Sequence, residues 1–148
     1  MEALNAEDAV DAGEGKNKKA WGDSEEDRLA TQVIDGAFRV HSALGLGLLE
    51  SVYETCLAHE VRKAGLSFQR QLGLPVRYDG LSLDAGFRID LLVADRLVLE
   101  IKAVDKVLPI HAAQLLTYLK LGGYRLGLLL NFNVIHMRDR VKRLANGL

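Results

Sequence analysis

Two short segments decide the fold that we expect for this chain. They are Phe87-Arg88-Ile89-Asp90-Leu91-Leu92-Val93 and Leu97-Val98-Leu99-Glu100-Ile101-Lys102-Ala103. Both arms are rich in Val, Ile and Leu, which is typical of strands buried on both faces of a sheet. The short interval between them predicts a β-hairpin. Asp90, Glu100 and Lys102 stand out, because a charge in a buried strand costs free energy unless it has a partner.

The register of this hairpin decides whether its two acids meet. A two-residue turn would place Asp90 and Glu100 on opposite faces of the sheet. A three-residue turn at 94–96 pairs Val93 with Leu97 and brings the two acids to the same face, as would a bulge that shifts the register by one residue. Because a cation shared by the two acids requires the second arrangement, we predict that the carboxyl groups lie on the same face.

The residues alone leave two interpretations of these charges open. In the first, Glu100 and Lys102 are solvated on a one-sided sheet, or pair only with each other. In the second, Asp90 and Glu100 bind a divalent cation. Two carboxylates about 4 Å apart repel by roughly 4 kcal/mol at an effective dielectric constant of 20, and a cation bound between them would remove this cost. Carboxylates and water are the ligands that Mg²⁺ or Mn²⁺ prefers, and a nearby lysine stabilises negative charge on a phosphate.

The spacing of Asp90, Glu100 and Lys102 resembles the core motif of the PD-(D/E)XK nuclease superfamily. Ile89 stands where the motif's name has proline, a position that varies in the superfamily. The fold that this resemblance implies is a restriction-endonuclease-like one.

A second stretch, Gly47-Leu48-Leu49-Glu50-Ser51-Val52-Tyr53, resembles the signature of the GxxExxY family, a small branch of the same superfamily. The segments Gln114–Leu119 and Asn131–Phe132 resemble later blocks of that family. The resemblance covers about residues 30 to 145 and says nothing about residues 1 to 25.

The resemblance implies a metal-dependent nuclease that hydrolyses phosphodiester bonds of DNA or RNA, with Mg²⁺ or Mn²⁺ as its cofactor. The implied metal ligands are Asp90, Glu100, the carbonyl of Ile101 and Glu50. The implied catalytic residues are Glu50, Asp90, Glu100, Lys102 and Gln114. For Glu50 the residues alone favour a surface acid in the first turn of a helix, where the helix dipole stabilises it.

The candidate substrate-binding residues are Tyr53, His111 and Tyr118. Tyr53 lies one helical turn after Glu50, where it could orient that acid or contact phosphate. His111 and Tyr118 share one face of a predicted helix with Gln114, and a polar surface stripe is the alternative. His111 has no second histidine at the spacing of zinc ligands, so we do not interpret it as a zinc ligand. Glu54 is interpreted as a surface residue.

Length and composition predict one folded domain with a short leader. The chain has 148 residues, of which 49% are hydrophobic, as is ordinary for a globular protein. Residues 1–28 hold nine acids and four bases, whereas residues 29–148 hold eleven acids and fifteen bases. We expect residues 1–23 to be a disordered acidic leader and residues 24–148 to be the nuclease-like domain.

Other features bear on compartment and partners. Cys56 is the only cysteine, so an intramolecular disulfide or a cysteine-rich zinc site is excluded, which fits a reducing cytoplasm. No signal peptide or membrane-spanning segment is visible in the sequence. The mild positive charge of residues 29–148 is compatible with nucleic acid as the partner, and a homodimer is left open.

The hydrophobic pattern predicts an α/β fold with elements in the order α-α-β-β-β-α-β-β. The family resemblance implies that these elements form a restriction-endonuclease-like mixed sheet flanked by helices. The first helix starts at Ser24, buries Leu29, Val33, Ala37, Val40 and Leu44, and stops near Gly45. The other expected helices span about 48–64 and 110–121, and the other expected strands span 68–76, 81–93, which includes the first hairpin arm, and 127–133, before a basic segment at 134–144.

A second function on the same fold is a catalytically silent module that binds nucleic acid or a protein partner. The retention of Asp90, Glu100, Lys102 and Gln114 argues against it, because without catalysis nothing would require paired buried acids. A cleavage assay distinguishes the two functions.

Overall fold

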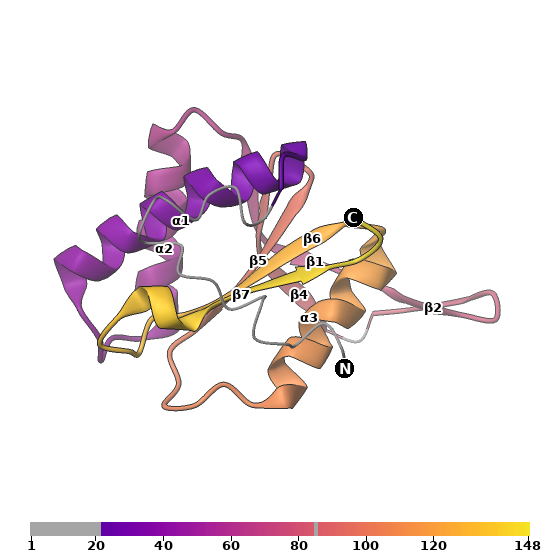
Figure 1. Cartoon of the computed structure of the whole chain (residues 1–148). Helices are drawn as coiled ribbons and strands as arrows, with labels where there is room; N and C mark the ends of the chain where they lie inside the picture. The colour runs from indigo at the N-terminus through magenta and orange to yellow at the C-terminus, as the bar shows by residue number, and fades with distance from the viewer. Residues whose placement is uncertain (1–21, 85) are drawn as a thin grey trace.

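A five-stranded mixed sheet forms the centre of the protein (Figure 1). The computed structural model describes residues 22–84 and 86–148, so that the predicted leader lies almost wholly outside the described residues. The strand order is β1-β4-β5-β6-β7, and only β5 and β6 run parallel. These strands are β1 (Phe68–Gly73), β4 (Arg88–Val93), β5 (Leu97–Lys102), β6 (Leu126–Asn131) and β7 (Val141–Ala145).

Helices cover both faces of this sheet (Figure 1). α1 (Glu25–Leu44) and α2 (Glu50–Lys63) pack on one face, and α3 (Pro109–Gly122), which connects the parallel strands β5 and β6, packs on the other. A short 3₁₀ helix (Met137–Arg140) precedes β7. A mixed sheet flanked by helices on both faces confirms the predicted α/β fold class. None of the described helices has the length and apolarity needed to span a membrane.

The start and the end of α1 agree with the prediction. The Ser24 Oγ accepts a hydrogen bond from the backbone N–H of Asp27 at 3.0 Å, and Gly45 ends the helix at φ +71°. Of the predicted buried residues, Val33, Ala37 and Val40 are buried, whereas the two at the ends of the stripe are not. Leu29 is half-buried and Leu44 is 40% exposed, while the fully buried residues lie at Ala30, Val33, Ile34, Ala37 and Val40. The face of α1 that packs against the core therefore includes Ala30 and Ile34 in place of Leu29 and Leu44.

The register predicted for the β4–β5 hairpin is confirmed. Val93 pairs with Leu97, and Ala94 and Asp95 adopt left-handed conformations in the three-residue turn, at φ +53° and +57°. The pairing continues to Leu91 opposite Leu99. One further step brings Asp90 level with Glu100.

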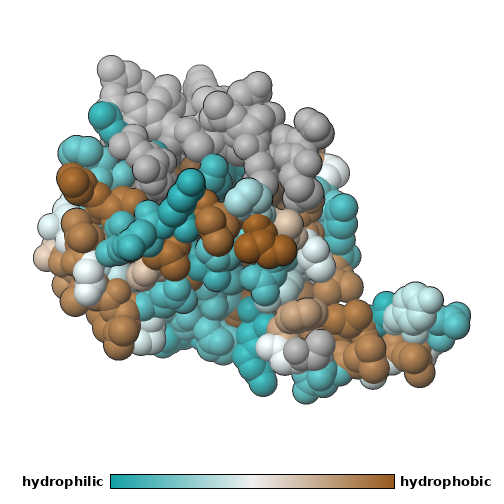
Figure 2. Space-filling model, turned by 90° about the horizontal axis from the view of Figure 1, so that it is seen from below, coloured by the Kyte–Doolittle hydropathy of each residue, from teal (hydrophilic) through white to brown (hydrophobic). Residues whose placement is uncertain are grey.

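A small hairpin interrupts the strands that we predicted as continuous at 68–76 and 81–93. β2 (Val76–Tyr78) and β3 (Leu81–Leu83) form a separate two-stranded sheet that projects from the body of the protein (Figures 1 and 2). Pro75 precedes β2 and cannot donate to a ladder, which explains why β1 stops at Gly73. The turn at Asp79-Gly80 is where the sequence predicts it.

Candidate active site

Asp90 lies where strands β4 and β5 separate. The last paired residues of this ladder are Leu91 and Leu99. Beyond them the Asp90 Oδ2 accepts a hydrogen bond from the backbone N–H of Ile101 at 2.7 Å. The side chain therefore takes the place of a backbone acceptor, and its carboxylate is held against β5 next to Glu100.

Glu100 is a buried acid with an incomplete set of partners. Glu100 is only 7% exposed, and its Oε2 lies 3.6 Å from the Lys102 Nζ. Its Oε1 is buried and has no hydrogen-bond partner within the described part of the chain. An unpaired buried carboxylate oxygen costs free energy, so this atom marks a place where a ligand would be stabilising.

The pKa of each of these two acids is shifted upward. Burial, and after it the charge of Asp90, raise the pKa of the Glu100 carboxyl to about 8. Burial also raises the pKa of Asp90, against the hydrogen bond from Ile101, which lowers it. Such a pair is unfavourable when both groups are ionised, and a bound cation would remove that cost.

The chemistry of this donor set fits a divalent metal ion only in part. Asp90 and Glu100 offer hard oxygen ligands, and the Glu100 Oε1 lacks a partner. However, among residues 22–84 and 86–148 no three His, Cys, Asp or Glu side chains are grouped so as to hold a metal ion by themselves. A metal here would therefore have to complete its shell with water, a backbone carbonyl or substrate oxygens, as Mg²⁺ commonly does.

Glu50 approaches the acids from the first turn of α2. Its Oε2 accepts a hydrogen bond from the backbone N–H of Ala103 at 3.3 Å, just beyond the end of β5. Its charge contributes to the raised pKa of Glu100. The predicted approach from the helix is thus seen, but the carboxylate is occupied by β5 and does not complete a three-acid cluster.

The polar stripe of α3 faces the sheet rather than solvent at its centre. Tyr118 is 4% exposed, and its pKa is raised by burial and by the charges of Glu100 and Asp90. Gln114 donates a hydrogen bond to the Tyr118 hydroxyl at 3.0 Å. His111 lies apart from this pair, because its Nδ1 accepts from the backbone N–H of Leu108 at 3.0 Å and caps the helix.

Tyr53 has a different position from the predicted phosphate contact. It is fully buried and stacks on Phe132 at a centroid distance of 4.7 Å. Its hydroxyl donates to the Gly45 carbonyl at 2.7 Å and accepts from the Leu48 N–H at 3.2 Å. Both hydrogen bonds hold the loop before α2, so Tyr53 fixes the point from which Glu50 starts.

Two asparagines hold the loops around the acids. The buried Asn131 accepts from the backbone N–H of Val104 at 3.1 Å and donates to the Val104 carbonyl at 2.9 Å. Asn133 accepts from the Gly47 N–H at 3.1 Å and donates to Asp105 at 3.1 Å. The loop before α2 and the loop after β5 are thereby tied to the end of β6.

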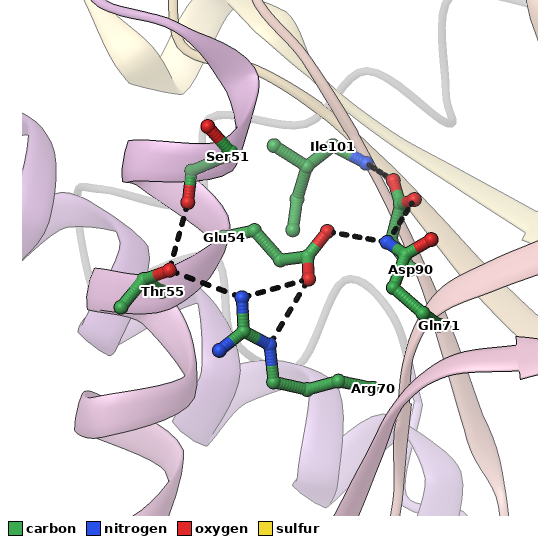
Figure 3. Close-up of polar contacts among 7 residues, drawn as sticks. All are labelled: Ser51, Glu54, Thr55, Arg70, Gln71, Asp90 and Ile101. Carbon is green, nitrogen blue, oxygen red and sulfur yellow. Dashed lines mark hydrogen bonds and ion pairs between the residues drawn. The ribbon is translucent and has the colours of Figure 1, made fainter.

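Glu54, Arg70 and Gln71 form a polar cluster next to Asp90 that the sequence did not predict (Figure 3). Glu54 is 7% exposed, not a surface residue, because it accepts hydrogen bonds from the Arg70 Nε at 3.0 Å and the Gln71 Nε2 at 2.8 Å. The Gln71 Nε2 also lies 3.3 Å from the Asp90 Oδ1. The position of Glu54 one turn after Glu50 was the available signal, since residues four apart share a helix face.

Comparison with known proteins gives one family. The family model of the PD-(D/E)XK nuclease superfamily matches residues 27–144, which is most of the chain. Neither the comparison with curated proteins nor the comparison with solved structures gave a match. The match spans all the strands and helices that carry the acids, from α1 into β7.

Proposed function

We propose that this chain, which belongs to the PD-(D/E)XK nuclease superfamily, is a metal-dependent nuclease that hydrolyses phosphodiester bonds of DNA or RNA. The observation that supports this proposal most directly is Glu100. This acid is buried level with Asp90, has a pKa raised to about 8 by burial and by Asp90, and keeps one oxygen without a partner beside Lys102. A purely structural ion pair with Lys102 would leave that oxygen without a partner, whereas a bound cation would use it as a ligand.

Asp90, Glu100 and the Ile101 carbonyl would hold Mg²⁺ or Mn²⁺, with Glu50 acting through water. When bound, such a cation supplies Lewis-acid polarisation of the phosphate and lowers the pKa of a bound water. The hydrogen bond from the Ile101 N–H orients the carboxylate of Asp90. The hydrogen bond from the Ala103 N–H holds Glu50 at the end of β5.

Lys102 stabilises the negative charge that develops on the phosphate and, with Gln114, positions the attacking water. Its ammonium group lies beside Glu100, and its side chain is 16% exposed, so a substrate oxygen has access to it. The hydrogen bond from Gln114 to the Tyr118 hydroxyl orients the amide that would position this water. Tyr118 and the more distant His111 are the residues that we assign to substrate contact.

Within the superfamily we assign the chain to the GxxExxY family. The segment from Gly47 to Tyr53 supports this assignment, because its two defining side chains have distinct structural roles. Glu50 contacts the end of β5, and Tyr53 holds the loop that precedes Glu50. We place the protein in the cytoplasm, which its single cysteine, Cys56, supports.

The test is a cleavage assay on single-stranded and duplex DNA and RNA, with Mg²⁺, with Mn²⁺ and with a chelator. We expect cleavage of at least one substrate with metal, and none with the chelator or with Glu100→Ala. Binding without cleavage would support the catalytically silent module instead. Equal cleavage by Glu100→Ala would remove Glu100 from the active site.

Divalent metal should also stabilise the fold. A ligand that binds only the folded state at 100 times its dissociation constant adds roughly 2.7 kcal/mol to the free energy of unfolding. Thermal melts with and without Mn²⁺ measure this gain, and Asp90→Asn should abolish it. An equal gain in Asp90→Asn would show that the metal binds elsewhere.

A second copy of the chain is the protein partner that we propose for the β2–β3 hairpin. The pairing of Val76 with Leu83 and of Tyr78 with Leu81 places all four apolar side chains on one face. Tyr78 is 71% exposed and Leu81 58% exposed, and hydrophobic residues gather on the projecting hairpin in Figure 2. An isolated two-stranded hairpin is at best marginally stable in water, so a partner that is always present would stabilise it.

Sedimentation measurements test this homodimer. We expect wild-type protein to sediment as a dimer and the double variant Tyr78→Ser, Leu81→Ser to sediment as a monomer. Arg77→Ser, on the polar face of the same hairpin, is the matched control and should leave the dimer intact. A monomeric wild type, or a dimeric double variant, would refute this proposal.

A further inference from the structure

Gln71 has a backbone conformation that its place in the fold does not explain. It lies inside β1 with φ +51°, in the left-handed region that is unfavourable for residues other than glycine. The other described residues of this kind, Asp79, Ala94 and Asp95, lie in hairpin turns. Such a conformation costs on the order of 1–3 kcal/mol and persists only where the surroundings impose it.

The side chain of Gln71 connects a helix to the active site. Its Nε2 donates to the Glu54 Oε1 on α2 at 2.8 Å and to the Asp90 Oδ1 on β4 at 3.3 Å (Figure 3). The register of β1 and β4 places Gln71 level with Asp90, between the pairs that flank them. One amide group therefore lies between two carboxylates that would otherwise face each other with no donor between them.

Glu54 is itself held firmly on its other side. Its Oε2 lies 3.0 Å from both the Nε and the Nη2 of Arg70, and this Nη2 also donates to the Thr55 Oγ1 at 3.0 Å. Both guanidinium nitrogens contact the same oxygen, so Arg70 anchors Glu54 at Oε2 and leaves Oε1 to accept from Gln71. Glu54 thus provides a fixed acceptor that orients the amide of Gln71.

Both oxygens of Asp90 are consequently fixed by donors from two different strands. The Ile101 N–H on β5 holds Oδ2, and the Gln71 amide on β1 holds Oδ1. We infer that Gln71, oriented by Glu54, is a positioning residue that fixes the carboxylate of Asp90 in the orientation that binds the divalent cation. This inference rests on the proposed function and extends it to residues that do not touch the substrate.

Glycine separates this role from a purely structural one. Gln71→Gly suits a left-handed conformation better than glutamine does, so the backbone of the variant is less strained. The same variant lacks the amide. A structural role predicts that stability falls while metal affinity stays constant, whereas a positioning role predicts that metal affinity falls in a protein that remains folded.

The experiment compares full-length wild type, Gln71→Gly and Gln71→Leu by Mn²⁺ titration, with the melting temperature as the readout. Gln69→Leu is the matched control, because Gln69 lies in the same strand but donates to Asp95, away from the acids. We expect the Mn²⁺ concentration at half-saturation to rise about 10–100-fold in both Gln71 variants, as is usual when a residue that orients a metal ligand is lost. Gln69→Leu should titrate like the wild type.

A cleavage assay over the same Mn²⁺ range gives a second readout. Cleavage by the Gln71 variants should be restored towards the wild-type rate at high Mn²⁺. Unchanged half-saturation in Gln71→Gly would overturn the inference but not the proposed function, provided that the wild type binds Mn²⁺ and cleaves. If neither Gln71 variant folds, Gln71 is a structural bridge and the inference is wrong. A wild type that neither binds Mn²⁺ nor cleaves would overturn both.

Discussion

Lys102→Met is expected to slow phosphodiester cleavage about 10²–10³-fold, the usual effect of removing one group that stabilises developing charge in a transition state. The methionine side chain retains most of the length of the lysine stem and removes only the ammonium group, which lies 3.6 Å from the Glu100 Oε2. The loss should appear in kcat rather than in the Mn²⁺ concentration at half-saturation. Single-turnover cleavage at saturating Mn²⁺ measures it.

Lys106→Met provides the matched control, since Lys106 is an exposed lysine on the loop that follows β5. It removes the same charge from the loop just after β5, and no contact of Lys106 with the acids is seen in the described part of the chain. We expect its rate to stay within about twofold of the wild-type rate. Equal losses in the two variants would show that only the overall charge of the surface matters, and would contradict the role of Lys102.

The metal-free protein should lose stability as the pH rises from about 5 to 8. The pKa of Glu100 is raised from 4.5 to about 8, first by burial and then by Asp90. Between these two values the folded state binds a proton that the unfolded state has released, so folding becomes less favourable with increasing pH. The slope approaches about 1.4 kcal/mol per pH unit for one such group, and the total is a few kcal/mol.

Urea denaturation in the presence of a chelator, repeated at several pH values, measures this dependence. Asp90 contributes in the same direction, because burial raises its pKa as well. In Glu100→Gln the decline should be largely absent, and above pH 8 the variant should be more stable than the metal-free wild type. A wild type whose stability rises steadily over this range would show that Glu100 is ionised in the folded state without cost.

The hairpin shows how much of the site could be predicted from the sequence. The three-residue turn with Asp95 at its centre fixed the register, and the alternation of side chains then brought Asp90 level with Glu100. Both features depend on residues close together in the chain. The approach of Glu50 was predicted only from the family resemblance, because no local pattern shows where a helix end will lie relative to a strand.

Several residues could not be placed in this way. The spacing of Tyr53 from Glu50 does not predict whether Tyr53 is exposed or buried. It is buried because α2 packs against Phe132. Pro75 predicted an irregular strand, but the separation of β2 and β3 from the main sheet depends on where β1 and β4 stop pairing. These outcomes depend on how whole elements pack.

The sequence by itself determined the class of fold and the order along the chain of the elements that build the main sheet, because periodicity and turn chemistry are properties of neighbouring residues. It left two registers open for the hairpin, and the requirement of a shared cation selected the one in which the two acids are level. Only the tertiary structure decided that Glu54 is buried and that Gln71 connects it to Asp90. Glu54 and Gln71 are 17 residues apart in the chain. Their contact requires α2 to lie over β1 and Gln71 to adopt a left-handed conformation, and no local sequence pattern encodes either condition.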